Sequence, residues 1–143
     1  MRVIVLAVGR LRPPYADDVQ HYAKLLGRYV RLELVEVRED AQVAGRLPQG
    51  PAGGGPGPFT SLLHAGGDAY SSEQFALFLE ERRRSGRDLC FVIGGAYGLE
   101  RLDAAEHRFS LGPMTLPHQL ARVVLLEQLY RGHKILAGEP YHH

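Results

Sequence analysis

Cysteine, net charge and long apolar stretches are all scarce in this chain of 143 residues. The single cysteine, Cys90, excludes an intrachain disulfide bond and a cluster of thiolate metal ligands. Its place inside an apolar run favours a core residue over a reactive thiol. No apolar run approaches the ~20 residues that cross a bilayer. Because the formal net charge is only +1, any contact with nucleic acid must come from a local basic patch.

Signals for targeting and for metal binding are missing as well. The segment Arg2 to Val8 enters a strand pattern directly, is too short for a secretory signal and has no small-residue cleavage site. We therefore expect a cytoplasmic protein without a membrane partner. The seven histidines lack ligand spacing, and the terminal pair His142 and His143 is weak evidence for a metal, so we expect no metal site. The length fits one domain over residues 1–143.

Apolar runs indicate where the strands lie. Val3 to Val8 and Leu89 to Ile93 are continuous apolar runs, which predict strands covered on both faces, as in parallel sheets. The mixed run Leu32 to Val37 predicts a strand nearer the edge of the sheet, and Phe59 to Leu63 predicts a short strand.

Helical patterns alternate with these strands. They begin near Asp17 and at Ser71, and they also cover residues 100–108 and 118–136. Ser71 can cap the second helix in a capping box, Gly86 can end it, and Pro117 suits the first position of the last helix. The last helix is apolar around most of its circumference, which favours a partner chain beside its own core. The alternation predicts an α/β fold with a mainly parallel sheet of about five strands.

Two segments have the composition of protein surface. Ten of the fourteen residues 45–58 are Gly or Pro, which predicts a mobile surface loop without regular structure. Arg82, Arg83, Arg84 and Arg87 cluster at the end of the second helix, where a solvated helix end is favoured over an RNA contact.

Three turns follow strand candidates, at Leu63 to Gly67, Gly94 to Gly98 and Leu111 to Pro117. If the strands are neighbours, these turns meet at one edge of the sheet and form a pocket of main-chain groups and small apolar side chains. Such a pocket suits adenosine. The phosphate-binding loop motif and the G-x-G-x-x-G fingerprint are both absent. Glycines after a strand are a weak signal, since they form a plain turn at least as often as a ligand site.

Several motifs together resemble one family. They are Ile93-Gly94-Gly95 with Tyr97-Gly98-Leu99, Met114-Thr115-Leu116-Pro117-His118, Leu120-Ala121-Arg122-Val123, Glu127-Gln128-Leu129-Tyr130-Arg131 and the terminal Pro140-Tyr141-His142. The chain is similar along its whole length to the RlmH methyltransferases of the SPOUT class. The resemblance implies a homodimer that binds S-adenosylmethionine in a C-terminal trefoil knot. It also implies methylation of N3 of a pseudouridine in helix 69 of 23S rRNA, within the assembled 70S ribosome.

The resemblance assigns roles position by position. It implies cofactor contacts at these residues: Leu63, Gly95, Gly112, Pro113, Met114, Thr115, Leu116 and Pro117. It places His118 and Arg122 at the RNA, and Arg131, Tyr141 and His142 nearest the methyl transfer. Two features depart from the family. His64 stands where an aspartate is usual, and the loop 45–58 replaces a segment that is usually helical.

The chemistry suggests how these residues would act. Methyl transfer depends mainly on in-line positioning, while loss of the N3 proton is favoured by a nearby cation such as Arg131. Tyr141 and His142 would orient the base or help to take its proton. Each residue also has a simpler interpretation. Arg131 can pair with Glu127 four residues earlier, His118 can cap its helix, and the neighbouring Tyr130 can pack in the core or the dimer interface.

Two other functions compete with the methyltransferase. The changed residue His64 and the near-neutral charge allow a non-catalytic ribosome-binding protein on the same scaffold. The three open turns allow a small nucleotide-binding enzyme with a flavodoxin-like sheet, which would retain flavin.

Overall fold

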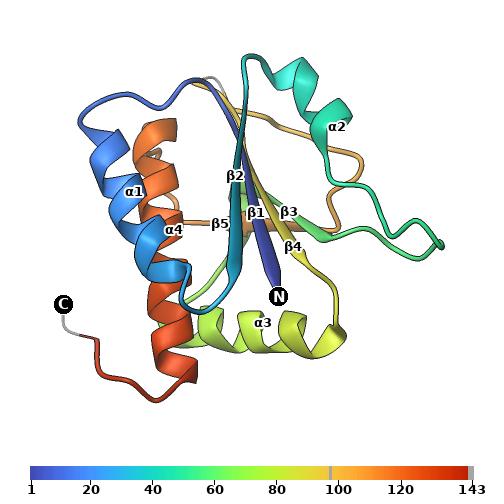
Figure 1. The fold of residues 1–143 in the computed structure, drawn as a ribbon. Coiled ribbons are helices and arrows are strands. Elements are labelled where there is room, and N and C mark those ends of the chain that lie inside the picture. Colours follow the sequence, from blue (N-terminus) through green and yellow to red (C-terminus); the bar gives the residue numbers. More distant parts are fainter. Residues whose placement is uncertain (97, 142–143) are drawn as a thin grey trace.

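A computed structural model describes residues 1–96 and 98–141 of the chain. In this part of the chain, five strands form one parallel sheet in the order β2-β1-β4-β3-β5 (Figure 1). The strands are β1 (Arg2–Val8), β2 (Arg31–Val37), β3 (Phe59–Ala69), β4 (Leu89–Ile93) and β5 (His107–Ser110). The helices are α1 (Tyr15–Leu26), the 3-10 turn η1 (Asp40–Gln42), α2 (Val43–Arg46), α3 (Ser72–Ser85) and α4 (His118–Leu136). The predicted α/β class is confirmed.

Alternating side chains of the central strands supply two cores, one on each face of the sheet. On one face, Val3 and Val5 of β1 and Phe91 of β4 pack against α1, α3 and α4. On the other face, Ile4 and Cys90 pack against α2 and the segment after β4. Burial raises the pKa of the Cys90 thiol to about 12, so it is the inert core residue that the sequence predicts.

Helix ends follow the predicted chemistry in most places. The hydroxyl of Ser71 accepts a hydrogen bond from the Gln74 N–H, and Oε1 of Gln74 accepts one from the Ser71 N–H. Gly86 ends α3 in the left-handed conformation at φ 77°. The prediction that Pro117 is the first residue of α4 is wrong. Pro117 is the residue before the helix, because its ψ of 136° is extended.

The strand β3 is longer than predicted, and the open turn expected at residues 64–67 is wrong. β3 continues through this segment to Ala69, with a shift of register between Leu63 and Asp68 where it pairs with β5. Gly67 makes the pairing possible, because a Cβ at that position would lie 2.5 Å from the Arg108 carbonyl carbon. The glycines here serve a close approach of strands, which the sequence pattern does not distinguish from a turn.

The helix expected over residues 100–108 is also wrong. This segment is irregular up to Glu106 and then forms β5, whose first residue His107 pairs with Ser61 of β3. Leu99, Leu102 and Ala105 recur every three residues and do face the core, but they do so from irregular chain. The exposed edge of β3 offers main-chain hydrogen bonds that outweigh the local helical pattern.

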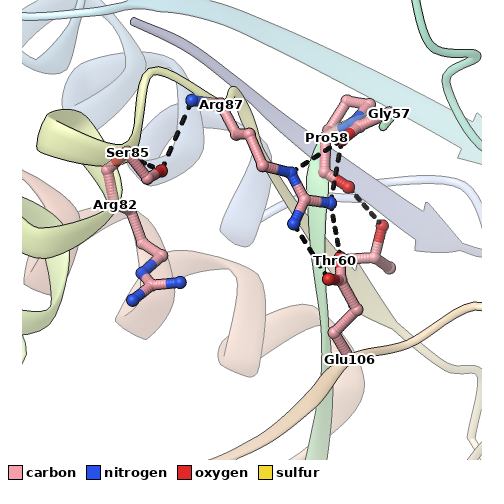
Figure 2. A network of polar contacts seen from close by, with 7 residues as sticks. All are labelled: Gly57, Pro58, Thr60, Arg82, Ser85, Arg87 and Glu106. Carbon is pink, nitrogen blue, oxygen red and sulfur yellow. Dashed lines mark hydrogen bonds and ion pairs between the residues drawn. The ribbon is translucent and has the colours of Figure 1, made fainter. Parts of the chain in front are cut away.

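The loop over residues 45–58 is irregular except at its start, where Gly45 and Arg46 belong to α2, so the predicted absence of regular structure is wrong there. Its end is fixed by Arg87. This guanidinium donates to the Gly57 carbonyl at 2.9 and 3.0 Å and to both carboxylate oxygens of Glu106 at 2.9 and 2.6 Å (Figure 2). The loop therefore returns to β3 at a fixed point.

The other arginines of the α3 end are also engaged. Arg83 and Arg84 both bind the carboxylate of Glu80, and the guanidinium carbon of Arg82 lies 4.5 Å from the centre of the Phe59 ring. This pattern fits the predicted solvated helix end. No helix in the described residues combines the length and apolarity that spanning a bilayer requires.

Candidate active site

A cavity of about 160 Å³ lies where β3, β4 and β5 meet the start of α4. The three segments that the sequence predicts as neighbours all contribute to its wall. Of the residues expected to bind the cofactor, the following six line it: Leu63, Gly95, Gly112, Met114, Thr115 and Leu116. Pro113 and Pro117 are not among its lining residues. A larger hollow of about 710 Å³ has walls made mostly of α3 side chains, so it lacks the exposed main chain that an adenosyl group requires.

The turn after β4 has room for glycine only. A Cβ on Gly94 would lie 2.6 Å from the Leu99 nitrogen, so the chain folds back on itself directly after the strand. The next residue, Gly95, donates its N–H to Oδ1 of Asp40 at 3.0 Å. Asp40 belongs to η1, so a carboxylate from the far side of the sheet fixes one wall of the cavity. The sequence gives no signal for this contact between residues 55 positions apart.

Ser110 connects two further walls of the cavity, and the sequence pattern did not indicate it as a site residue. Its buried hydroxyl lies 3.1 Å from the Ala65 carbonyl of β3 and 3.1 Å from the Gly112 carbonyl, and it accepts from the Gly112 N–H at 3.0 Å. With one proton, the hydroxyl can donate to one of the two carbonyls at a time. Gly112 has a φ of 123°, which other residues rarely adopt. Ser110 thus holds the segment after β5 against β3.

His64, the departure from the family pattern, makes a contact of its own. Its Nδ1 accepts from the Gly66 N–H at 2.9 Å, so Nε2 carries the proton and donates to Oε2 of Glu100 at 2.9 Å. His64 lines the cavity, and Glu100 directly follows Leu99, which also lines it. Where the resemblance led us to expect an aspartate, this chain therefore has a histidine that is paired with a carboxylate.

His118 lies on the cavity wall at the start of α4. Its ring forms no hydrogen bond with the described residues, so the capping interpretation is wrong. Burial lowers the pKa of His118, and the nearby charges of Arg122 and Arg12 lower it further. The ring is therefore a neutral imidazole at neutral pH, which can donate or accept one hydrogen bond.

Arg122 lies one helical turn beyond His118 and is 5% exposed. Its guanidinium donates to Oε2 of Glu36 at 2.6 Å, to the Val8 carbonyl at 3.1 Å and to the Gly9 carbonyl. Burial alone would raise the pKa of Glu36, but hydrogen bonds from Arg122 and the Leu11 N–H lower it overall. Within one chain, Arg122 joins α4 to the ends of β1 and β2, and its RNA contact stays a prediction.

Arg131 and Tyr141 lie together, toward the end of α4 opposite to His118. Arg131 Nε donates to Oε1 of Glu127 at 2.8 Å, the Tyr141 hydroxyl lies 3.3 Å from the same oxygen, and the Arg131 guanidinium carbon lies 4.3 Å from the centre of the Tyr141 ring. The predicted Arg131–Glu127 pair is confirmed. Tyr130 is buried, in agreement with the packing interpretation. His142 lies outside the described residues.

The cavity and the Arg131 cluster are far apart in one chain. Arg131 lies thirteen positions after His118 on the same continuous helix, which corresponds to about 20 Å at a rise of 1.5 Å per residue. The structure therefore brings the predicted cofactor residues together with His118, but it does not bring Arg131 and Tyr141 to the same cavity.

Comparison with known proteins identifies the class. Residues 1–142 match a family described as "Predicted SPOUT methyltransferase", so the chain belongs to the SPOUT methyltransferases. Within that class it groups with proteins named ribosomal RNA large subunit methyltransferase H, as the motifs predict. It is 46% identical to the protein of Anaeromyxobacter sp. (strain Fw109-5), over 99% of both chains. It is 41% identical to that of Pelotomaculum thermopropionicum, over 99% of this chain and 98% of the relative. It is 42% identical to that of Gloeobacter violaceus, over 100% and 99%.

The cavity fits part of a methyl donor of the S-adenosylmethionine type. Its wall consists of main-chain groups and apolar side chains such as Leu63 and Leu116, which suit an adenosyl group. At about 160 Å³ it is smaller than the roughly 300 Å³ at which typical ligand pockets begin. The described walls therefore enclose only part of such a ligand. Met114 and Thr115 stand exposed at the rim, and Met114 is 80% exposed.

Proposed function

We propose that the protein is an S-adenosylmethionine-dependent methyltransferase of ribosomal RNA that methylates N3 of a pseudouridine in helix 69 of 23S rRNA. The observation that carries the proposal is the cavity of main-chain and apolar groups at the ends of β3, β4 and β5, in a chain whose relatives are named for the large ribosomal subunit. The substrate would be the assembled 70S ribosome in the cytoplasm.

The chain's own residues would position the reactants. S-adenosylmethionine supplies an electrophilic methyl group on its sulfonium. Leu63, Gly95 and the segment 112–116 would hold the adenosyl part and exclude water, which leaves positioning as the main source of rate. Gly112 allows the backbone to turn around the ligand, and Ser110 keeps that turn in place. His118, neutral and on the wall, would contact the target nucleotide.

The second half of the site would come from a partner subunit. Arg131 lies about 20 Å from His118 along α4, too far to act on a methyl group held in the same chain. In a homodimer, Arg131 and Tyr141 of one subunit can face the cavity of the other. This arrangement would also cover apolar residues of α4 that a single chain leaves partly buried or exposed, namely Leu120, Val123, Val124, Ile135 and Leu136. The proposal includes the trefoil knot of the family.

Arg131 and Tyr141 would then have distinct roles. Burial disfavours the charge of Arg131, but the hydrogen bonds and the charge of Glu127 outweigh it and raise its pKa, so the cation persists. It can stabilise the anion that forms when the nucleobase N3–H is lost. Burial and then the charge of Glu127 raise the pKa of Tyr141 to about 12, so the phenol keeps its proton at neutral pH. We assign Tyr141 to orienting the base as a donor, and His142 to taking the proton.

One experiment tests the activity directly. Ribosomes from cells that lack the enzyme are incubated with the purified protein and S-adenosylmethionine, and the rRNA nucleosides are analysed by mass spectrometry. We expect one new N3-methylpseudouridine per ribosome. Absence of methylation across a range of salt and magnesium concentrations would refute the proposal.

A second candidate function is a non-catalytic ribosome-binding protein. The observation that favours it is that His64, at the position where the resemblance leads us to expect an aspartate, is paired with Glu100. Isothermal titration separates the two candidates, because a protein without catalysis should give no heat with S-adenosylmethionine.

A further inference from the structure

A second hollow, of about 500 Å³, lies beside the cofactor cavity and is lined by arginines. Three separate segments each contribute one: Arg10 follows β1, Arg38 follows β2, and Arg46 ends α2. All three side chains belong to exposed residues. We call this hollow, lined by Gly9, Arg10, Glu36, Val37, Arg38, Gln42 and Arg46, the arginine pocket.

The positive charge of the arginine pocket is not neutralised within the described chain. Arg10, Arg38 and Arg46 form no ion pair there, and the single lining carboxylate, Glu36, is bonded to Arg122 and the Leu11 N–H. The charge of Arg10 contributes to the low pKa of Glu36 without a direct contact. Three cations therefore share a hollow with one carboxylate that is already committed.

Two nearby carboxylates do not pair with the arginines of this pocket. Asp40 accepts the N–H of Gly95, and Glu39 forms no ion pair with an arginine in the described residues. The arginines at the end of α3 present the opposite case, since Arg83 and Arg84 share Glu80. Unpaired guanidinium groups that converge from separate segments are a site for an anion that can accept several forked hydrogen bonds.

The arginine pocket adjoins the cofactor cavity through one shared wall. Gly9 lines the arginine pocket, and a Cβ on Gly9 would lie 3.3 Å from Nε2 of His118, which lines the cavity. Asp40, which lies between Arg38 and Gln42 in the chain, accepts the N–H of Gly95 on the cavity wall and so links the two sites a second time. A ligand that enters the cavity beside His118 can therefore extend directly into the arginine pocket.

We propose that the arginine pocket binds backbone phosphates of the RNA strand that carries the target nucleotide. The inference rests on the proposed function, because it takes the RNA as the ligand. The base would enter at His118 while neighbouring phosphates occupy the pocket over Arg10, Arg38 and Arg46. Such contacts fix the register of the strand and carry no sequence information. They also explain how a chain with net charge +1 can hold a polyanion.

The test compares two double variants with the same change of charge. Arg38→Gln with Arg46→Gln removes two pocket cations, and Arg83→Gln with Arg84→Gln removes two paired cations on α3. Binding to unmodified ribosomes is measured by co-sedimentation at several KCl concentrations, which requires no methyl transfer. Loss of two phosphate contacts should weaken binding at least tenfold and reduce the slope of log K against log salt by about 1.4–1.8. The α3 variant should stay within about twofold of the unmodified protein, a small effect typical of exposed pairs.

Other readouts separate this inference from the proposed function. The affinity for S-adenosylmethionine, measured by titration, should be the same in both double variants, and the KM for ribosomes should rise with kcat unchanged in the pocket variant. If the protein binds ribosomes without methylating them, the proposed function fails while the pocket is still tested. Equal effects of the two double variants would overturn the inference. ATP is the control for a small-nucleotide site: a pocket variant that loses the binding of ATP but keeps the binding of ribosomes would also overturn the inference.

Discussion

A dimer made from two different defective subunits should recover activity. If Arg131 acts on the methyl transfer as proposed, the separation of about 20 Å between His118 and Arg131 along α4 requires each reaction centre to combine the cavity of one chain with the Arg131 end of another. Gly112→Val damages the cavity, because Gly112 has a φ of 123° that a β-branched residue cannot adopt without strain. Arg131→Ala removes the cation and leaves the cavity intact. Each variant alone should be inactive as a homodimer.

The expected recovery follows from counting sites. In a mixed dimer, one centre combines the intact cavity of the Arg131→Ala chain with the intact Arg131 of the Gly112→Val chain, and the other centre carries both defects. A purified mixed dimer should therefore show about half the activity of the unmodified dimer, and a random mixture of subunits about a quarter. The two chains are co-expressed with different affinity tags, and methyl incorporation into unmodified ribosomes is measured for each purified species.

Controls make the outcome decisive. The Arg131→Ala homodimer should bind S-adenosylmethionine normally, whereas the Gly112→Val homodimer should not. Size-exclusion chromatography with light scattering reports whether every species is dimeric. A mixed dimer no more active than its parents would refute the shared centre, and so would a fully active monomer.

Three further predictions concern stability. Ser110→Ala should lower the free energy of unfolding by about 1–3 kcal/mol, because it leaves buried main-chain groups without their partner. It should also weaken the binding of S-adenosylmethionine. Urea unfolding and titration calorimetry measure the two effects, and an unchanged unfolding midpoint would contradict the role given to this hydroxyl. Burial lowers the pKa of His107, His118 and His133, so the unfolded chain binds more protons than the folded one. The stabilisation that these neutral histidines provide is complete above the unfolded pKa of about 6.5 and is lost as the pH falls through their lower folded pKa values. The urea midpoint should therefore drop between pH 8 and pH 5. A midpoint that does not change with pH would exclude this linkage. Arg87→Ala should lower the unfolding free energy by about 1–3 kcal/mol through loss of its charged hydrogen bonds; an effect as small as that of an exposed Arg84→Ala control would show that the contact contributes little.

Local pattern predicts the centre of the fold well and its edge poorly. β1 and β4 are covered on both faces, and burial of this kind leaves a continuous apolar run that is legible in the sequence. The pairing of β3 with β5 depends on a partner strand some 45 residues away along the chain, as in the contact of Ser61 with His107. For this reason the end of β3 resembled a turn, and the segment before β5 resembled a helix.

The candidate site shows the same division. The glycine-containing segments were predicted to meet, and the residues Gly95 and Gly112 do line one cavity. The groups that fix those segments, Asp40 and Ser110, act through single hydrogen bonds to distant main chain, for which no periodicity exists in the sequence. The distance from the cavity to Arg131 follows from the length of α4. Because the sequence predicts that helix, the separation of His118 from Arg131 could also have been predicted.

The hold of Arg87 on Gly57 has a practical consequence for studying this protein. Because Arg87 fixes the segment that leads into β3 at Gly57, we expect changes in the exposed residues 51–56 to leave the sheet unaffected. A side chain added at Gly53 or Gly54 would meet nothing within 4 Å. A short peptide label inserted between these two glycines should leave the cavity at the ends of β3, β4 and β5 undisturbed, and would allow single molecules of the protein to be followed.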